Sequence, residues 1–158
     1  MKRMIAVLLA ACLLLTGCAA PQEEAKAETE PWTAEEVGSF EAENGTFTGG
    51  AHAEGGFATG FESDGDSCSV TVSVQESGFY DLEFLIRAIG GYKENYISLD
   101  GSRIGFVSAE GKGFTRSRLR RVYMEAGNHT VTFEKYWGYT DFDKVIILTS
   151  EPFDESIF

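Results

Sequence analysis

The chain has 158 residues, a formal net charge of −12 at pH 7, 43% hydrophobic residues and 13% aromatic residues. This length suits one ordinary domain, and the apolar fraction is high enough for a packed core, which argues against an intrinsically disordered chain. An acidic surface repels phosphate backbones, and the 2 histidines leave little for a zinc site, so neither nucleic-acid binding nor histidine-dependent hydrolysis is expected.

The N-terminal segment has the order of a secretory signal. Basic residues precede an almost unbroken apolar run over residues 5–15, which is too short to span a bilayer as a mature helix. Residues 15–18 (LTGC) resemble the bacterial lipobox, in which a peptidase cuts before the cysteine and the thiol is lipid-modified. We therefore expect residues 1–17 to be a lipoprotein signal peptide and Cys18 to anchor the protein to the extracytoplasmic face of a membrane.

Residues 18–36 connect this leader to the body of the chain. After Cys18 they are acidic, rich in alanine and without apolar periodicity, which predicts a flexible linker. Cys12 leaves with the signal and Cys18 carries the lipid, so Cys68 is the cysteine that stays in the body, and no disulfide is expected within it.

From about residue 37 the sequence alternates with a period of two. Residues 67–74 (SCSVTVSV) alternate small polar and apolar side chains, which predicts a strand with one buried face. Residues 80–88 repeat this pattern, and it predicts that Asp81, Glu83 and Arg87 face outward.

Turn signals separate the later strands. Gly90-Gly91 is expected to end the preceding strand, and Asp100-Gly101 to join residues 96–99 to residues 103–107 in a tight hairpin. Further strands are predicted at residues 122–124, 130–133 and 145–148. Short strands with a turn signal every eight to twelve residues, roughly, are typical of a β-sandwich. Residues 37–150 are therefore predicted to form one all-β domain of antiparallel strands, followed by a C-terminal tail at 151–158.

Five segments of this domain resemble a known family in their order and spacing. They are residues 40–45 (FEAENG), 60–67 (GFESDGDS), 77–82 (SGFYDL), 126–131 (AGNHTV) and 137–143 (WGYTDFD). Together they look like a family 35 carbohydrate-binding module, close to family 6, and the last segment is most similar to modules attached to β-mannanases. The resemblance implies a jelly-roll β-sandwich, a structural calcium, and non-catalytic binding of a polysaccharide such as β-mannan or galactomannan.

Acidic residues near both ends of the domain suggest where a calcium ion would bind. Glu41 and Glu43 are two residues apart, so in a strand both carboxylates leave the same face and repel unless a cation neutralises them. The resemblance implies that Glu41, Glu43 and Asp143 are the calcium ligands, with backbone carbonyls supplying the rest. From the spacing alone, a solvated strand face of acids is the alternative.

Two loops combine aromatic and polar side chains suited to sugars, residues 90–95 (GGYKEN) and 136–139 (YWGY). Pyranose rings pack on aromatic faces, and their hydroxyls bind planar polar or charged groups. In the family these loops lie near one another at an edge of the sandwich. The expected ligand-binding residues are Trp137 and Tyr92 as stacking platforms, Asn95 and Lys93 as hydrogen-bonding partners, and Tyr139 and Phe114 as secondary candidates. Core or loop packing is the alternative for each aromatic residue.

Two other functions stay open. The basic cluster of Arg116, Arg118, Arg120 and Arg121 could bind uronic-acid-containing glycans, although a strand face that offsets nearby acids is the simpler interpretation. The family often has a tryptophan near the position of Phe114. Its absence favours a protein-interaction or envelope-structural module without sugar binding.

No catalytic residue is predicted. Asp141 and Asp143 come from one strand and cannot flank a glycosidic bond, and Cys68 lies in an apolar row with no base nearby. We therefore expect a non-enzymatic polysaccharide binder on the cell surface, held there by its lipid anchor, and a monomer is compatible with the sequence.

Overall fold

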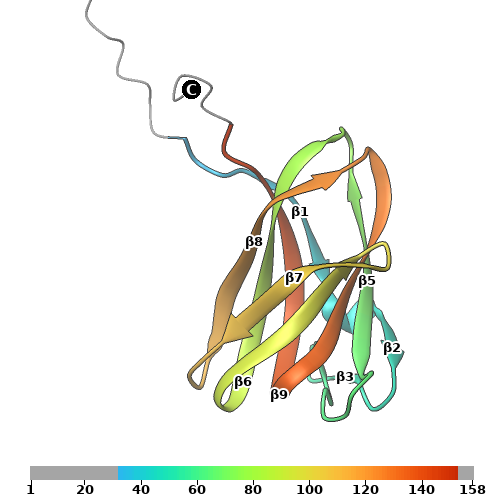
Figure 1. Ribbon diagram of the computed structural model, residues 1–158, viewed down its shortest axis with the longest axis vertical. Coiled ribbons are helices and arrows are strands. Elements are labelled where there is room, and N and C mark those ends of the chain that lie inside the picture. The colour runs from blue at the N-terminus through green and yellow to red at the C-terminus, as the bar shows by residue number, and fades with distance from the viewer. Residues whose placement is uncertain (1–31, 153–158) are drawn as a thin grey trace, which may run out of the picture. The chain divides into compact units, whose positions relative to one another are not determined.

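The computed structural model describes residues 32–152, which form an all-β fold (Figure 1). The elements are β1 (Glu36–Glu41), a 3-10 turn (Ala42–Asn44), β2 (Thr46–Thr48), β3 (His52–Glu54), β4 (Phe57–Thr59), β5 (Ser67–Val74), β6 (Gly78–Leu99), β7 (Ser102–Ala109), β8 (Phe114–Met124) and β9 (Gly127–Thr149). The predicted signal peptide, the Cys18 anchor and the linker up to residue 31 lie outside the described residues. Nothing in 32–152 forms a helix long and apolar enough to cross a membrane.

Two long strands, β6 and β9, take part in both layers of a sandwich (Figure 1). In one layer, the first half of β9 pairs with β5 and with the second half of β6, and β2 and β7 extend the edges. In the other layer, the second half of β9 pairs with β1 and the first half of β6, which also pairs with β8. All pairs are antiparallel, and the predicted jelly-roll β-sandwich is confirmed.

Glycines bend the long strands where they pass from one layer to the other. Gly90 and Gly91 have φ values of 78° and 87°, and Gly138 of β9 has a φ of 77°. These left-handed conformations are easy for glycine because it has no Cβ. The expectation that Gly90-Gly91 ends a strand is wrong, because β6 continues through the bend to Leu99.

The predicted hairpin between β6 and β7 is confirmed. Leu99 pairs with Ser102, and the two residues between them, Asp100 and Gly101, have φ values of 49° and 81°. Positive φ at both central positions matches the twist of the flanking strands, and it favours the Asp-Gly pair found here.

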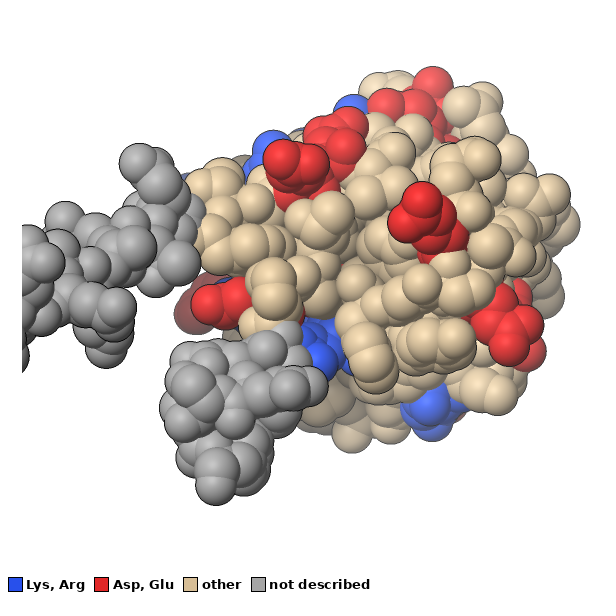
Figure 2. Space-filling model, turned by 90° about the horizontal axis from the view of Figure 1, so that it is seen from above, with Lys and Arg blue, Asp and Glu red and all other residues tan. Residues whose placement is uncertain are grey.

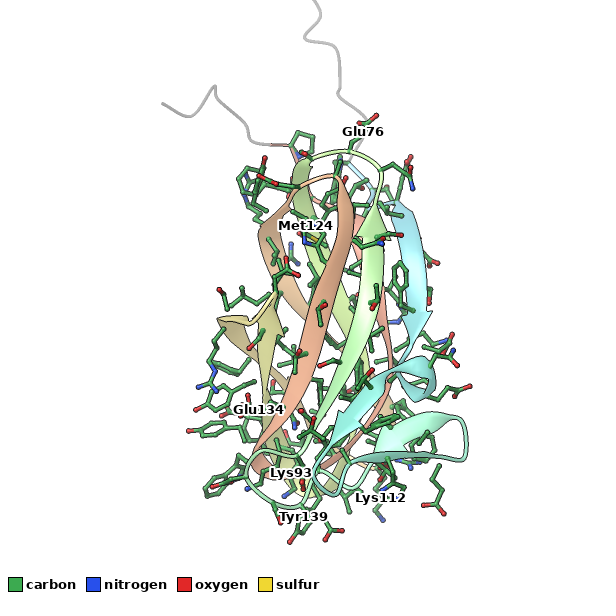
Figure 3. All side chains as sticks on the ribbon, turned by 90° about the vertical axis from the view of Figure 1, so that its right-hand side faces the viewer. Glu76, Lys93, Lys112, Met124, Glu134 and Tyr139 are labelled. Carbon is green, nitrogen blue, oxygen red and sulfur yellow. The ribbon has the colours of Figure 1, made fainter. Side chains whose placement is uncertain are left out.

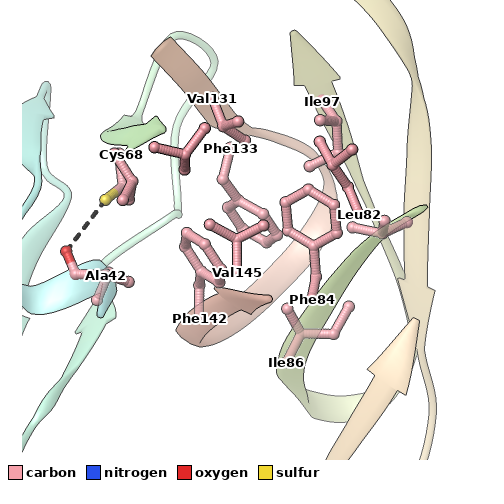
Figure 4. Close-up of a cluster of buried hydrophobic side chains, with 14 of the residues drawn as sticks. Ala42, Cys68, Leu82, Phe84, Ile86, Ile97, Val131, Phe133, Phe142 and Val145 are labelled. Atoms are coloured by element: carbon pink, nitrogen blue, oxygen red, sulfur yellow. Dashed lines mark hydrogen bonds between the residues drawn. The ribbon is translucent and has the colours of Figure 1, made fainter. Parts of the chain in front are cut away.

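Apolar side chains from both layers meet in one core (Figure 4). Phe133 and Phe142 are fully buried and stack with ring centroids 4.6 Å apart, and Phe84 lies 5.9 Å from Phe142. Cys68 belongs to this core and donates a weak hydrogen bond to the Ala42 carbonyl at 3.4 Å. Burial raises the pKa of the Cys68 thiol to about 12, so this thiol is no nucleophile near neutral pH.

Two acids expected to face solvent are buried under arginines. Asp81 and Glu83 lie on the outer side of β6, yet they are only 3% and 4% exposed. Arg118 donates to Glu83 at 2.6 Å, and Arg116 also pairs with Glu83. Burial alone would raise the pKa of Glu83, but the hydrogen bonds from Arg118 and Arg116 lower it overall.

Candidate functional site

One end of the sandwich collects the bends and loops that the sequence singled out. Figure 3 shows Lys93, Lys112 and Tyr139 at this end, with Glu76 and Met124 toward the other. The bend of β6, the bend of β9 and the loop between β7 and β8 therefore meet here, as expected for residues 90–95 and 136–139.

Three of the predicted aromatic residues are open to solvent at this end. Trp137 is 62% exposed, Tyr139 is 49% exposed and Tyr92 is 47% exposed. The hydroxyl of Tyr92 donates to Glu94 at 2.6 Å, and Glu94 is the ladder partner of Trp137. The structure thus brings Tyr92 and Trp137 to the same edge, and packing in the core does not account for either ring.

A depression of about 470 Å³ lies beside Trp137. The loop between β4 and β5 and the two long strands supply its lining, which consists of Glu62, Lys93, Lys135, Tyr136, Trp137, Gly138 and Tyr139. The ammonium group of Lys93 donates to the Gly90 carbonyl at 2.9 Å, which holds this side chain over the bend. The predicted set of Trp137, Lys93 and Tyr139 is therefore assembled around one hollow that offers ring faces and hydrogen-bonding groups.

Gly138 makes this assembly possible. A Cβ at Gly138 would lie 2.2 Å from Cδ of Lys93, and its φ of +77° is already unfavourable for other residues. Glycine at this position therefore allows the Lys93 side chain to cross the β9 bend between Trp137 and Tyr139.

Asn95 is not available to a ligand in this arrangement. It is fully buried, its Oδ1 accepts from Thr140 at 3.0 Å, and its Nδ2 donates to the Glu134 carbonyl at 3.3 Å. The expectation for Asn95 is thus corrected: strand alternation places it on the inner side with Ile97, where its amide satisfies buried polar groups.

A second depression, of about 690 Å³, was not foreseen from the sequence. It is lined by Arg87, Ala88, Ile89, Gly90, Gly91, Glu110, Gly111, Lys112 and Asp141. The charged groups of Arg87, Glu110 and Lys112 are hydrogen-bonding partners for hydroxyls. The residues of this hollow come from β6, from the loop between β7 and β8, and from β9, and no local pattern in the sequence brings these three segments together.

Arg87 and Asp141 form the most buried ion pair of this hollow. Asp141 is 2% exposed, and it accepts from Arg87 Nε at 2.8 Å and from Thr59 Oγ1 at 2.6 Å. The Arg87 guanidinium lies 4.8 Å from the ring centroid of Phe114 and 5.0 Å from that of Phe57. Phe114 therefore packs on Arg87 beside the hollow, a contact not predicted for it.

Two of the three predicted calcium ligands, Glu41 and Asp143, lie beside a lysine. Lys144 Nζ lies 2.8 Å from Glu41 Oε1 and 3.6 Å from Asp143 Oδ2, and the hydrogen bond to Glu41 raises the pKa of Lys144. Glu43 lies in the 3-10 turn instead of a strand, so the same-face argument for Glu41 and Glu43 does not hold. Among the described side chains no group of three or more His, Cys, Asp or Glu could hold a metal ion.

As placed, these three acids do not form a calcium cage, because the Lys144 ammonium already neutralises Glu41. A calcium ion here would require Lys144 to move away from Glu41. The calcium site implied by the resemblance stays a prediction.

The arginine cluster is largely engaged within the protein. Arg116 and Arg118 pair with Glu83, and Arg121 donates through its backbone N–H to Asp81 and through its guanidinium to the Glu151 carbonyl. Figure 2, which views the end opposite the Trp137 depression, shows acidic side chains dispersed among uncharged ones, with few basic groups between them. These contacts favour the interpretation that the arginines offset nearby acids.

Comparison with known families gives one match. Residues 36–149 match the family model described as "Carbohydrate binding module (family 35)". This match covers every strand of the described structure.

Relatives and solved structures agree with that match. The chain is 29% identical over 117 residues to mannan endo-1,4-beta-mannosidase B from Piromyces sp, which covers 68% of this chain and 20% of that protein. It is also similar to the crystal structure of a GH26-CBM35 beta-(1,4)-mannanase from Podospora anserina, with 26% identity, a TM-score of 0.65, and coverage of 74% of this chain and 28% of that one. The chain therefore spans between about a fifth and somewhat more than a quarter of these proteins.

An isolated module has the same fold. The chain is similar to the structure of a carbohydrate-binding module CBM36 in complex with calcium and xylotriose, with a TM-score of 0.57. The match covers 72% of this chain and 100% of that one. At 14% identity this likeness concerns the fold alone.

Proposed function

The chain belongs to carbohydrate-binding module family 35, and we propose on this premise that its folded domain binds a neutral polysaccharide, β-mannan or galactomannan, without cleaving it. The mannan ligand is supported by the named relatives, which are mannan-degrading enzymes. The family model that matches this chain describes a binding module, so binding rather than hydrolysis is the proposed activity.

The observation that carries this proposal is the exposed indole of Trp137 next to a polar hollow. Trp137 is 62% exposed and lines this hollow together with the exposed rings of Tyr136 and Tyr139, and exposed aromatic residues that are grouped in this way mark binding surfaces. The C–H face of a mannose unit can pack on the Trp137 ring, while Lys93 and Glu62 lie in reach of its hydroxyls at the hollow's edge. Tyr139 and Tyr92 offer further ring surface at the same end.

The proposed mode of action is tethered retention. With Cys18 lipidated, many copies on one cell surface would meet a repetitive chain at once, and such multivalency raises the effective affinity of a modest single site. The protein would then hold polysaccharide near the cell. This part of the proposal rests on the sequence motif at residues 15–18, and labelling of Cys18 by a fatty-acid analogue in the producing cell tests it.

The proposed site is tested by replacing Trp137. We expect Trp137→Ala to lower the affinity for β-mannan at least tenfold, because the main stacking surface is removed. Affinity electrophoresis in gels with and without galactomannan measures this, and circular dichroism checks that the fold is kept. Phe79→Ala is the matched control, since Phe79 is 52% exposed and lies at the start of β6, near the opposite end that carries Glu76. Equal retention of Trp137→Ala and the wild-type protein would exclude this site.

An acidic glycan is the second candidate ligand, and one observation favours it. The larger hollow is lined by Lys112 and by Arg87, which also pairs with Asp141, and these cations could bind a uronate. Binding of this kind would weaken steeply with salt and be competed by glucuronate. Salt-independent retention on neutral mannan would instead support the main proposal.

A further inference from the structure

The outer face of one layer carries aromatic rings among small polar side chains. Phe106 on β7 is 53% exposed and Tyr136 on β9 is 43% exposed, and neither belongs to the hydrophobic core. Tyr96 on β6 lies between them: it is the ladder partner of Phe106 and stacks on Tyr136 with ring centroids 4.2 Å apart. We call these three residues the aromatic strip.

The middle ring of the aromatic strip, Tyr96, has a contact on each face. The Arg103 guanidinium lies 3.5 Å from the ring centroid of Tyr96, and its Nη2 is 3.5 Å from Glu134 Oε2. Tyr96 is therefore fixed between Tyr136 and Arg103, and the stacking fixes the Tyr136 ring in turn. A surface ordered before binding loses little side-chain entropy when a ligand covers it.

The strip continues directly from the Trp137 depression. Tyr136 lines that depression and precedes Trp137 in the chain, so one side chain belongs to both surfaces. Figure 3 shows Glu134, the ladder partner of Tyr96, close to the end that carries Lys93 and Tyr139. The two surfaces thus form one path from the edge of the sandwich onto its face.

Hydroxyl groups accompany the rings on this face. The next row of the layer contains Ser69, Thr132 and Ser98, which are ladder partners across β5, β9 and β6. Ser69 Oγ and Thr132 Oγ1 are 2.9 Å apart, and each hydroxyl keeps further capacity to donate or accept. Rings beside hydroxyls match a ligand that alternates C–H faces and hydroxyl groups along its length.

We infer that the aromatic strip extends the binding site, so that the ligand is an internal stretch of several sugar units running from the Trp137 depression across Tyr136 to Phe106. This inference rests on the proposed function and adds to it the form of the ligand: a chain segment instead of a chain end or a single sugar. Phe106 lies on β7, which among the described strands pairs with β6 alone, so the path reaches a sheet edge where a long polysaccharide can continue.

Calorimetric titration with β-1,4-linked mannooligosaccharides of two to six units tests the inference. The wild-type protein should bind more tightly as the ligand lengthens. Phe106→Ala should leave the affinity for the shortest ligand unchanged and lower that for the longest about five- to tenfold, the effect of one lost aromatic contact. Phe106→Leu, which keeps an apolar side chain without the ring, should behave like Phe106→Ala.

Controls separate this inference from the proposed site. Trp137→Ala should weaken binding at every length, and Tyr123→Ala, which removes an aromatic side chain that is also 53% exposed but packs on Phe79, should change nothing. Wild-type affinity of Phe106→Ala for the six-unit ligand, or equal wild-type affinity for two and six units, would overturn the extended site while leaving the Trp137 site intact. No binding of any ligand by the wild-type protein would overturn both.

Discussion

Arg87 and Asp141 show how single residues fix the end of the sandwich that carries the proposed site. The two are ladder partners on β6 and β9, and the buried carboxylate receives the guanidinium beside the Thr59 hydroxyl. Phe57 and Phe114 pack on Arg87, so one side chain joins an ion pair to the aromatic contacts beside the larger hollow.

Replacing Arg87 should therefore destabilise the protein strongly. Arg87→Ala leaves the Asp141 carboxylate buried without its cation, and we expect the free energy of unfolding to fall by about 2–3 kcal/mol. Arg103→Ala is the matched control, because the Arg103–Glu134 pair is exposed and should contribute less than about 1 kcal/mol. Urea titrations of both variants give the comparison, and equal losses would contradict the role assigned to burial.

Individual residues also show where sequence reasoning stopped. Trp137, Tyr92 and Lys93 could be selected because their loops had aromatic and glycine signals. Asn95 and Glu83 could not be placed correctly, because alternation gives the side of a strand and not what covers that side. Glu83 is buried by arginines from β8, a long-range contact that leaves no local pattern.

At the scale of elements, the bend of β9 depends on Gly138. In Gly138→Ala the positive φ costs about 1–2 kcal/mol, and the new Cβ also displaces Lys93. Gly101→Ala is the control, since Gly101 has a φ of +81° with open space around it. Both variants should lose similar stability in thermal melts, but only Gly138→Ala should also lose mannan affinity. Full affinity in Gly138→Ala would show that the bend does not set the site.

The turn between β6 and β7 is fastened to β9 by a histidine. Asp100 accepts from His129 Nδ1 at 2.6 Å and from the Thr130 N–H at 2.8 Å, and His129 Nε2 lies 2.7 Å from the Glu125 carbonyl. Both partners of the ring are acceptors, so the protonated form is favoured. The hydrogen bond to Asp100, and then that to Glu125, raises the pKa of His129.

The hydrogen bonds of His129 predict that the stability of the protein depends on pH. Because the folded-state pKa of His129 is raised, its contribution to stability is complete below its ordinary pKa of about 6.5 and is lost as the pH rises through the raised value. We expect Tm to fall by about 1–3 °C between pH 6 and pH 8.5. His129→Gln should remove this dependence and His52→Gln should keep it. An unchanged slope in His129→Gln would assign the effect to other groups.

At the scale of the whole molecule, the fold could be predicted from the sequence, but the pairing register of the strands could not. Alternation identified the buried row of β5, and the turn residues Asp100-Gly101 identified the hairpin between β6 and β7. Together these signals indicated a sandwich. The prediction missed that β6 continues through Gly90-Gly91, because a Gly-Gly pair is equally compatible with a turn that ends a strand and with a bend inside one. Which strands meet at one end is decided by long-range pairing, and the larger hollow could not be foreseen for that reason.

Calcium dependence is a property of the whole domain that the family resemblance predicts. If Glu41, Glu43 and Asp143 bind the ion, EDTA should lower Tm and added calcium should restore it. Lys144→Met should then strengthen the response, because the competing ammonium is gone. If the Tm of the wild-type protein and that of Lys144→Met both respond to neither chelator nor calcium, the calcium prediction is wrong, and Lys144 is the cation that neutralises Glu41.

The central claim is that the folded domain binds a neutral polysaccharide through its exposed aromatic end. Affinity electrophoresis of the wild-type protein in gels containing galactomannan, a uronate-rich polysaccharide or no polysaccharide tests it most directly. We predict strong retardation by galactomannan and little by the acidic polymer. Identical mobility in all three gels, for a protein that still melts cooperatively, would contradict the claim.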